Sequence, residues 1–238
     1  MRLCMFHPLD HPMERGWVGR IDGDRVVHLA AQTLQSFFTG GGSAREHAEY
    51  GLAEVCLLTP VLHPPAVRIF EDQGTFAFAN PAAVVGPRAR VARPESNAPA
   101  DHMSQGSLTV IPRVAGVIGA SGALAGFTGF AEWRAPDLPV PKDRDFALGL
   151  GPVVVTSDEL DPARIEVVVR VDGRERLRGP APSFDWRAGR ELAAENTVLR
   201  AGDLVVGPGF DPAPGLGESA VEIELVGLGA LEQVVVGD

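Results

Sequence analysis

The six histidines are the first candidates for chemistry, because imidazole binds metals and transfers protons near neutral pH. His7 and His11 have the four-residue spacing of a helical ligand pair, but Pro8 and Pro12 disfavour the helix that would align them. We therefore interpret both as surface histidines. The other four are isolated in the sequence and have no ligand-like partner near them in the chain: His28, His47, His63 and His102.

Charged side chains are the next candidates, since the chain has no Gly-x-Ser-x-Gly elbow and no phosphate-binding glycine pattern. The motifs described below, and the family resemblance that they carry, single out Glu132 and Lys142 for proton transfer and Arg113 or Arg134 for holding an anion through a guanidinium group. A structural interpretation competes for each residue. Lys142 stands in the charged run 142–145, which is typical of solvated surface, and Glu132 could form a structural ion pair with either arginine.

Residues 1–60 are predicted to form a small α+β domain. Residues 17–21 and 25–29 have the pattern of two strands, and Asp22-Gly23-Asp24 supplies the hairpin turn between them. Leu34, Phe37 and Phe38 have helical spacing. A second, weaker helix is predicted over residues 44–53, and an extended, proline-stiffened linker over residues 57–65.

Residues 61–238 are predicted to form the main domain, and most of its pattern indicates strands. Apolar side chains alternate over residues 165–171 and 221–225, and Asp172-Gly173 supplies a turn. Residues 88–107 lack periodicity and predict a loop. Residues 186–196 are the best helix candidate in this half. The predicted fold class is therefore α+β, mostly β.

Composition excludes several classes of function. Hydrophobic residues make up 45% and charged residues 22% of the 238 residues, as in soluble globular proteins. A net charge of −10 with scattered basic residues argues against nucleic-acid binding. No apolar run approaches the roughly 20 residues of a membrane helix, and no signal peptide is recognisable. We expect a cytoplasmic protein whose two cysteines are reduced.

Ordered motifs then accumulate along the main domain. They run through Phe76-Ala77-Phe78-Ala79-Asn80-Pro81, Gly86-Pro87, Val117-Ile118-Gly119, Gly126-Phe127-Thr128, residues 130–137 and residues 142–152. Later ones are residues 154–160, Val171-Asp172-Gly173, residues 199–203 and residues 227–231. No single motif is specific, but their order and spacing resemble the fumarylacetoacetate hydrolase family, over about three quarters of the chain.

The resemblance implies a mixed β-sandwich or β-roll domain and a homodimer. It also implies a pocket in which a Glu-x-Glu pair and a later Asp hold Mg²⁺ or a similar ion beside a lysine. Members of the family hydrolyse acylpyruvates, decarboxylate oxaloacetate or isomerise related keto acids, and the ion stabilises the enolate that forms.

Several of these positions differ here. The Glu-x-Glu pair falls on Ile111-Pro112-Arg113, and the later Asp falls on Glu132. The arginine that meets substrate becomes Pro136, and the serine before it becomes Arg134. Gln73 stands at the position of the histidine that activates water, whereas Lys142 is retained.

Charge then decides the metal prediction. Three carboxylates become one carboxylate and, if Arg113 points inward, one guanidinium near the place of the cation. A hard divalent cation needs about six oxygen ligands and compensating negative charge. We therefore expect no metal cofactor, unless a site for Mg²⁺ or Mn²⁺ is rebuilt from other residues such as Glu71, Asp72 or Asp137.

Three hypotheses on function remain open. The first is a repurposed, metal-independent enzyme for a dicarbonyl or keto-acid ligand, in which Lys142, Glu132 and Arg113 are the catalytic candidates and Arg134 and Gln73 contact substrate. The second is a catalytically inactive homologue that binds a ligand or a partner subunit. The third is a metal-dependent carbon–carbon hydrolase of the acylpyruvate type.

Overall fold

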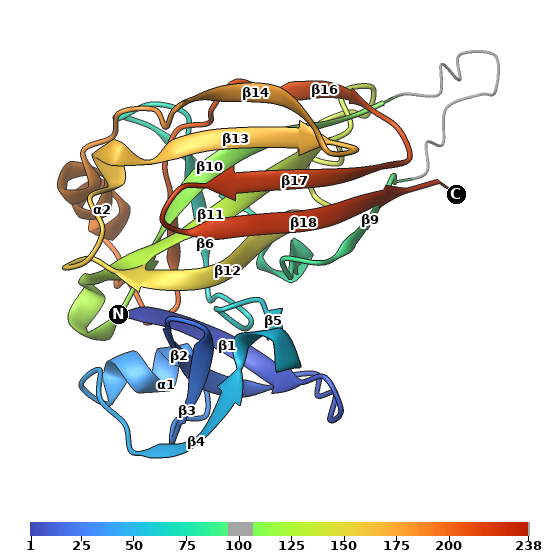
Figure 1. The fold of residues 1–238 in the computed structure, drawn as a ribbon. Coiled ribbons are helices and arrows are strands. Elements are labelled where there is room, and N and C mark those ends of the chain that lie inside the picture. Colours follow the sequence, from blue (N-terminus) through green and yellow to red (C-terminus); the bar gives the residue numbers. More distant parts are fainter. Residues whose placement is uncertain (95–106, 238) are drawn as a thin grey trace.

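The computed structural model describes residues 1–94 and 107–237, and its strands form two sheets (Figure 1). The larger sheet has a path of ten neighbouring strands: β4 (Glu46–Gly51), β3 (Arg25–Leu29), β2 (Trp17–Asp22), β1 (Arg2–Pro8), β12 (Leu148–Thr156), β11 (Leu124–Arg134), β10 (Leu108–Ile118), β15 (Leu204–Val206), β6 (Val67–Phe70) and β7 (Phe76–Ala79). Three more strands pair beside this path: β5 (Val55–Leu58) on β1, β8 (Val84–Val85) on β12 and β16 (Ala213–Leu216) on β10.

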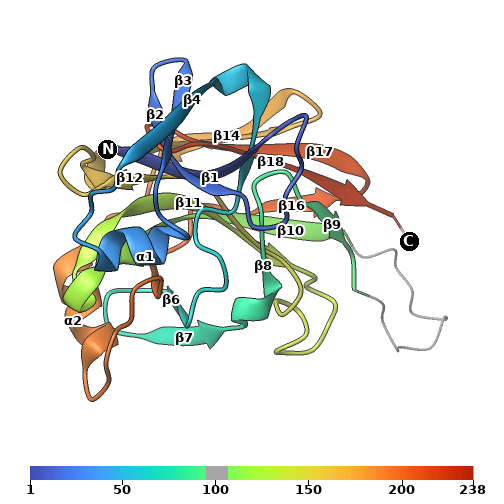
Figure 2. The ribbon, with the colours of Figure 1, turned by 90° about the horizontal axis from the view of Figure 1, so that it is seen from below.

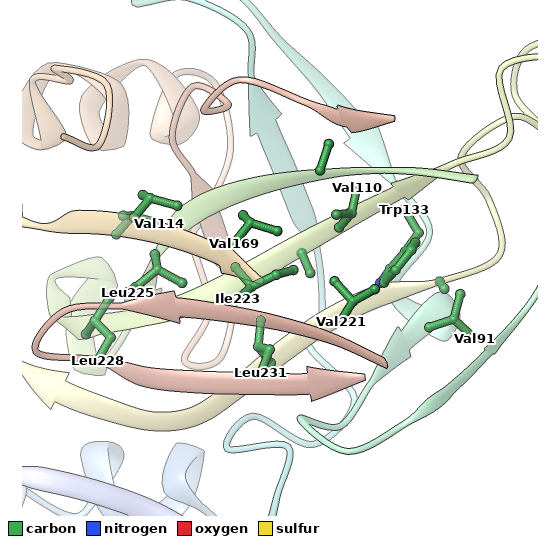
Figure 3. Close-up of a cluster of buried hydrophobic side chains, with 14 of the residues drawn as sticks. Val91, Val110, Val114, Trp133, Val169, Val221, Ile223, Leu225, Leu228 and Leu231 are labelled. Carbon is green, nitrogen blue, oxygen red and sulfur yellow. The ribbon is translucent and has the colours of Figure 1, made fainter. Parts of the chain in front are cut away.

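The smaller sheet packs against the middle of the larger one. Its strands follow the order β14 (Arg174–Pro180), β13 (Glu166–Val171), β17 (Ser219–Leu225), β18 (Gly229–Val236) and β9 (Arg90–Ala92). Figure 3 shows the apolar core between the sheets, to which Val114 and Trp133 come from β10 and β11, and Val169 and Ile223 from β13 and β17. This is the mostly β, α+β architecture with mixed sheets that the sequence predicts.

The N-terminal strands continue the larger sheet. Strand β1 lies beside β12 and pairs with it antiparallel (Figure 2). Leu3 and Met5 belong to the same buried cluster as Leu148 and Leu150. The domain boundary near residue 60 stays a prediction. Among the described residues, no helix is long and apolar enough to cross a membrane.

Most predicted elements are present. The hairpin of β2 and β3 turns at Gly23, whose φ of 61° suits glycine. Helix α1 (Leu34–Thr39) buries Leu34, Phe37 and Phe38, and helix α2 (Trp186–Ala194) begins at the cap Asp185. Strands β13 and β17 bury their predicted apolar face, and Asp172-Gly173 is the turn into β14.

Three predicted segments differ from the structure. Residues 44–53 form strand β4 and a short 3₁₀ turn rather than a helix, because β3 offers an open edge with which Glu46–Gly51 can pair. Residues 57 and 58 belong to β5, which pairs with β1, so the predicted linker begins after them. Within the predicted loop over residues 88–107, Arg90–Ala92 forms β9, and residues 95–106 lie outside the described residues.

Candidate functional site

Strands β10 and β11 place Arg113 and Glu132 on one face of the larger sheet. Ile111 is opposite Glu132 and Arg113 is opposite Phe130 in the antiparallel register. Because side chains alternate along a strand, Arg113 and Glu132 face away from the core between the sheets, into which their neighbour Trp133 points. On that opposite face, Arg113 points toward Glu132 rather than toward solvent, and both side chains are only 1% exposed.

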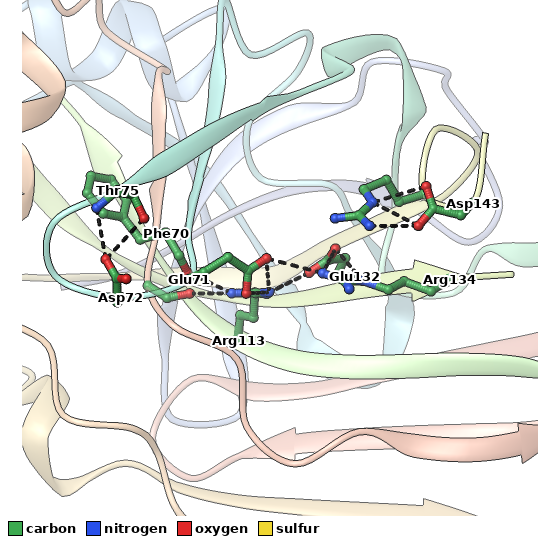
Figure 4. A network of polar contacts seen from close by, with 10 residues as sticks. Phe70, Glu71, Asp72, Thr75, Arg113, Glu132, Arg134 and Asp143 are labelled. Carbon is green, nitrogen blue, oxygen red and sulfur yellow. Dashed lines mark hydrogen bonds and ion pairs between the residues drawn. The ribbon is translucent and has the colours of Figure 1, made fainter. Parts of the chain in front are cut away.

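Each of the three guanidinium nitrogens of Arg113 donates to an acceptor (Figure 4). Its Nε donates to Glu132 Oε2 at 2.7 Å, and its Nη1 donates to the carbonyl oxygens of Phe70 at 2.9 Å and Gly207 at 3.1 Å. Its Nη2 lies 2.7 Å from Glu132 Oε2 and 3.1 Å from Glu71 Oε2. The positive charge is thus held between two carboxylates.

Arg134 completes the cluster from the solvent side. Its Nε donates to Glu132 Oε1 at 2.8 Å, and its Nη2 donates to Glu71 Oε1 at 3.2 Å. Glu71 bridges the two arginines, and 55% of its side chain is exposed. We call Glu71, Arg113, Glu132 and Arg134 the arginine–glutamate cluster.

Electrostatics favour the ionised form of Glu71. Partial burial acts to raise its pKa, but the charges and hydrogen bonds of Arg113 and Arg134 outweigh burial and hold the pKa below the usual value. A second pair lies beside the cluster in Figure 4, where Arg144 donates to Asp143 at 2.7 Å. The hydrogen bond to Asp143 raises the pKa of Arg144 against the effect of burial, and the charges of Glu132 and Glu71 add to it.

The structure brings three of the five predicted site residues together and places two elsewhere. Arg113, Glu132 and Arg134 are in the cluster. Lys142 is 70% exposed and its Nζ pairs with Asp145 Oδ2 at 2.6 Å. Gln73 exchanges two hydrogen bonds with the backbone of Asp185, the N-cap of α2.

The residues that could rebuild a metal site are also divided. Only Glu71 joins the cluster, whereas Asp72 caps its own loop by accepting from the backbone N–H groups of Gly74 and Thr75. Asp137 forms an ion pair with Arg93.

Sequence reasoning missed the backbone partners of the cluster. The carbonyl groups of Phe70 and Gly207 carry no signal in residue type, so only the fold reveals them. Gly209 packs over the cluster so closely that an added Cβ would lie 2.5 Å from Ile111 Cγ2 and 3.2 Å from Arg113 Cζ.

Structural comparisons place the whole chain in a known fold. Maleylpyruvate hydrolase from Sphingobium sp. SYK-6, in complex with manganese(II) and pyruvate, is 18% identical with a TM-score of 0.78, covering 100% of this chain and 99% of that one. The 5-carboxymethyl-2-hydroxymuconate delta-isomerase from Mycobacterium smegmatis is 22% identical with a TM-score of 0.76, covering 100% of both chains.

A third solved structure is 2-keto-3-deoxy-D-arabinonate dehydratase complexed with magnesium and 2,5-dioxopentanoate. It is 17% identical with a TM-score of 0.76, covering 100% of this chain and 99% of that one. Comparison with curated protein sequences gave no match. The family described as Fumarylacetoacetate (FAA) hydrolase C-terminal matches residues 41–236. With most of its length covered by this match and its strands in the same fold, the chain belongs to the fumarylacetoacetate hydrolase family.

Proposed function

We propose that this protein binds a small keto acid or 1,3-dicarbonyl acid and acts on it by acid/base chemistry without a metal ion. In this proposal, the guanidinium of Arg113 supplies the positive charge that manganese or magnesium supplies in the two relatives that were solved with those ions. The observation that carries the proposal is the burial of Arg113 between the carboxylates of Glu71 and Glu132.

The donor set suits a guanidinium and does not fit a divalent cation. All four carboxylate oxygens of Glu71 and Glu132 accept hydrogen bonds from Arg113 or Arg134. The two negative and two positive charges cancel. A cation such as Mg²⁺ needs about six oxygen ligands and compensating negative charge, so it would have to displace both arginines.

Glu71 marks the place of the ligand carboxylate. It is the most exposed member of the cluster, and it contacts Nη2 of both arginines from the solvent side. A keto-acid carboxylate has the same charge and geometry, so it can displace Glu71 and accept from the same two groups. In this proposal, the two guanidinium groups face the oxygen on which negative charge develops as an enolate forms. Stabilising that charge lowers the barrier of the reaction.

Glu132 acts in this proposal as a positioning residue. Both of its oxygens accept from guanidinium groups, so it orients Arg113 and Arg134. Lys142 can transfer a proton only if its loop moves, since its ammonium group now pairs with Asp145 at the surface. The variant Lys142→Ala decides this: unchanged turnover would remove Lys142 from the mechanism.

An inactive, ligand-binding homologue is the second candidate. Two observations favour it: each guanidinium nitrogen of Arg113 already donates to an acceptor, and Lys142 points toward Asp145. An arginine that serves only to fill and neutralise the pocket would look the same. Both candidates bind a keto acid, and they differ in turnover.

Calorimetry on chelator-treated protein, with pyruvate as the probe, tests binding. We expect pyruvate to bind without metal and Arg134→Gln to abolish binding. We expect Glu71→Ala to tighten binding about fivefold, because it removes a competing, half-exposed ion pair worth about 1 kcal/mol. Weaker binding by Glu71→Ala would contradict the displacement of Glu71.

The homodimer implied by the family resemblance stays a prediction, which sedimentation velocity tests.

Turnover of an acylpyruvate and of oxaloacetate then separates the candidates. The proposal requires turnover that persists in the presence of a chelator. Binding without turnover identifies the inactive homologue. Turnover that a chelator stops and Mn²⁺ restores would overturn the proposal in favour of a rebuilt metal-dependent hydrolase.

A further inference from the structure

Two histidines that are 19 residues apart in the sequence meet on the edge of the larger sheet. His28 lies on β3 and His47 on β4, the strand at the end of the sheet path. Val27 pairs with Glu49, but Leu29 pairs with Glu46, so β4 carries one extra residue opposite His28. This irregularity is a β-bulge, which redirects side chains, and it brings the two rings to a centroid distance of 5.1 Å with 36° between their planes.

The ring of His28 is held in place by its neighbours. Trp17 on β2 stacks against it at 4.7 Å with 14° between the planes. Partial burial and the nearby His47 lower the pKa of His28. His47 is exposed, so a metal ion can reach the pair from solvent.

We propose that His28 and His47 form a two-imidazole site for a borderline divalent cation such as Cu²⁺, Ni²⁺ or Zn²⁺. Imidazole nitrogens bind such ions at about 2.0–2.1 Å, which puts the centroids of two adjacent ligands roughly 5 Å apart. The observed separation of 5.1 Å matches this requirement. Oxygen-preferring cations such as Mg²⁺ and Ca²⁺ do not suit two nitrogen ligands.

The remaining coordination positions belong to solvent. Nearby Glu46 and Glu49 each pair with an arginine, at 2.7 Å from Arg20 and 2.7 Å from Arg25 respectively. Within the part of the chain that the structure describes, no group of three or more His, Cys, Asp or Glu side chains converges on a metal position. Because one ligand lies on β3 and the other on β4, the bound ion would cross-link these two strands. The inference is independent of the keto-acid proposal, whose residues lie on β10, on β11 and directly after β6.

Metal titration of the full chain after treatment with a chelator tests the site. We expect one equivalent of Cu²⁺ or Ni²⁺ to bind, with Cu²⁺ tighter than Ni²⁺, and no saturable binding of Mg²⁺. Bound Cu²⁺ or Ni²⁺ should quench the emission of Trp17, which stacks on His28. Ni²⁺ should also raise the unfolding temperature, since it binds the folded state, in which the two histidines are adjacent, more tightly than the unfolded chain.

Matched variants make the test specific. His47→Gln removes an exposed ligand without touching the stack on Trp17, so we expect it to keep its fold and lose the saturable binding. His28→Gln should lose it as well, and Trp17→Phe should bind the ion but lose the quenching. The exposed His11 provides the control variant His11→Gln, which should match the wild type. Unchanged binding of Ni²⁺ by His47→Gln, or its loss in His11→Gln, would overturn the proposal.

Discussion

The buried contact of Arg113 with Glu132 gives a prediction about stability at the scale of one residue. Arg113→Met leaves Glu132 in a position that is 1% exposed with only Arg134 as a partner, and two carbonyl groups lose their donor. Removing one partner of a buried ion pair costs about 3–5 kcal/mol, because the other charge stays buried. We expect a loss of this size in the free energy of unfolding, measured by urea denaturation.

Two further variants show whether the burial of charge is the cause. Arg187→Met breaks an exposed pair with Glu191 and should cost less than about 1 kcal/mol. Arg113→Met combined with Glu132→Leu should recover part of the loss, since it leaves no uncompensated charge in the site. A double variant as unstable as the single one would show that the cost arises from packing instead.

The depressed pKa of Glu71 predicts how the cluster responds to acid. The arginines lower this pKa below its ordinary value of 4.5, so the folded state binds a proton less readily than the unfolded chain. The stability that Glu71 contributes is therefore fully present above pH 4.5 and is lost as the pH falls through the lower, folded pKa. We expect the wild type to exceed Glu71→Gln in stability at pH 7 and to match it near pH 2. A difference that grows on acidification would contradict this sign.

The sequence could predict which side chains lie close together, but not which hydrogen-bond or ion-pair partners each of them has. Aligning the family motifs put Arg113 and Glu132 near the same place, and antiparallel pairing of β10 with β11 realises that contact. The charged run 142–145 indicated the surface position that Lys142 occupies beside Asp145, whereas the retained family motif favoured the pocket. The contact between the rings of His28 and His47 depends on a bulge, and the spacing of residues along the chain gives no sign of it.

At the scale of elements, the segment after β15 packs directly against the arginine–glutamate cluster, and Gly207 and Gly209 make the contact. A Cβ at Gly209 would lie 2.5 Å from Ile111 Cγ2, so either the segment or β10 must shift. Overpacking of this kind costs about 1–3 kcal/mol. We expect Gly209→Ala to lower the free energy of unfolding by that amount and to weaken pyruvate binding. Gly217→Ala is the control, because nothing lies within 4 Å of its added Cβ. Equal stability of the two variants would show that the segment after β15 can shift to make room for the Cβ without lowering the free energy of unfolding.

Pairing partners explain which elements the sequence could predict. The alternation in β13 and β17 is strong because one face of each strand packs into the core between the sheets. Residues 46–51 are mostly exposed and lack that alternation, so local propensity favoured a helix. Their strand arises from the free edge of β3, which is a property of the assembled sheet.

At the scale of the whole molecule, the buried thiol of Cys4 reports whether the N-terminal strands open separately from the rest. Burial raises the pKa of Cys4 to about 12, so the folded thiol is protonated and unreactive. Strand β1 pairs with β12, and Cys4 shares a buried cluster with Trp133 and Val153. These contacts predict that residues 1–60 and the rest of the chain unfold together. The test uses a variant in which Cys56→Ser leaves Cys4 as the only thiol, and Trp17→Phe with Trp186→Phe leaves Trp133 as the only tryptophan. Modification of Cys4 by a thiol reagent should then rise at the same urea concentration at which the emission of Trp133 changes. Modification of Cys4 at clearly lower urea would show instead that β1 detaches from β12 first, and that residue 60 marks a true folding boundary.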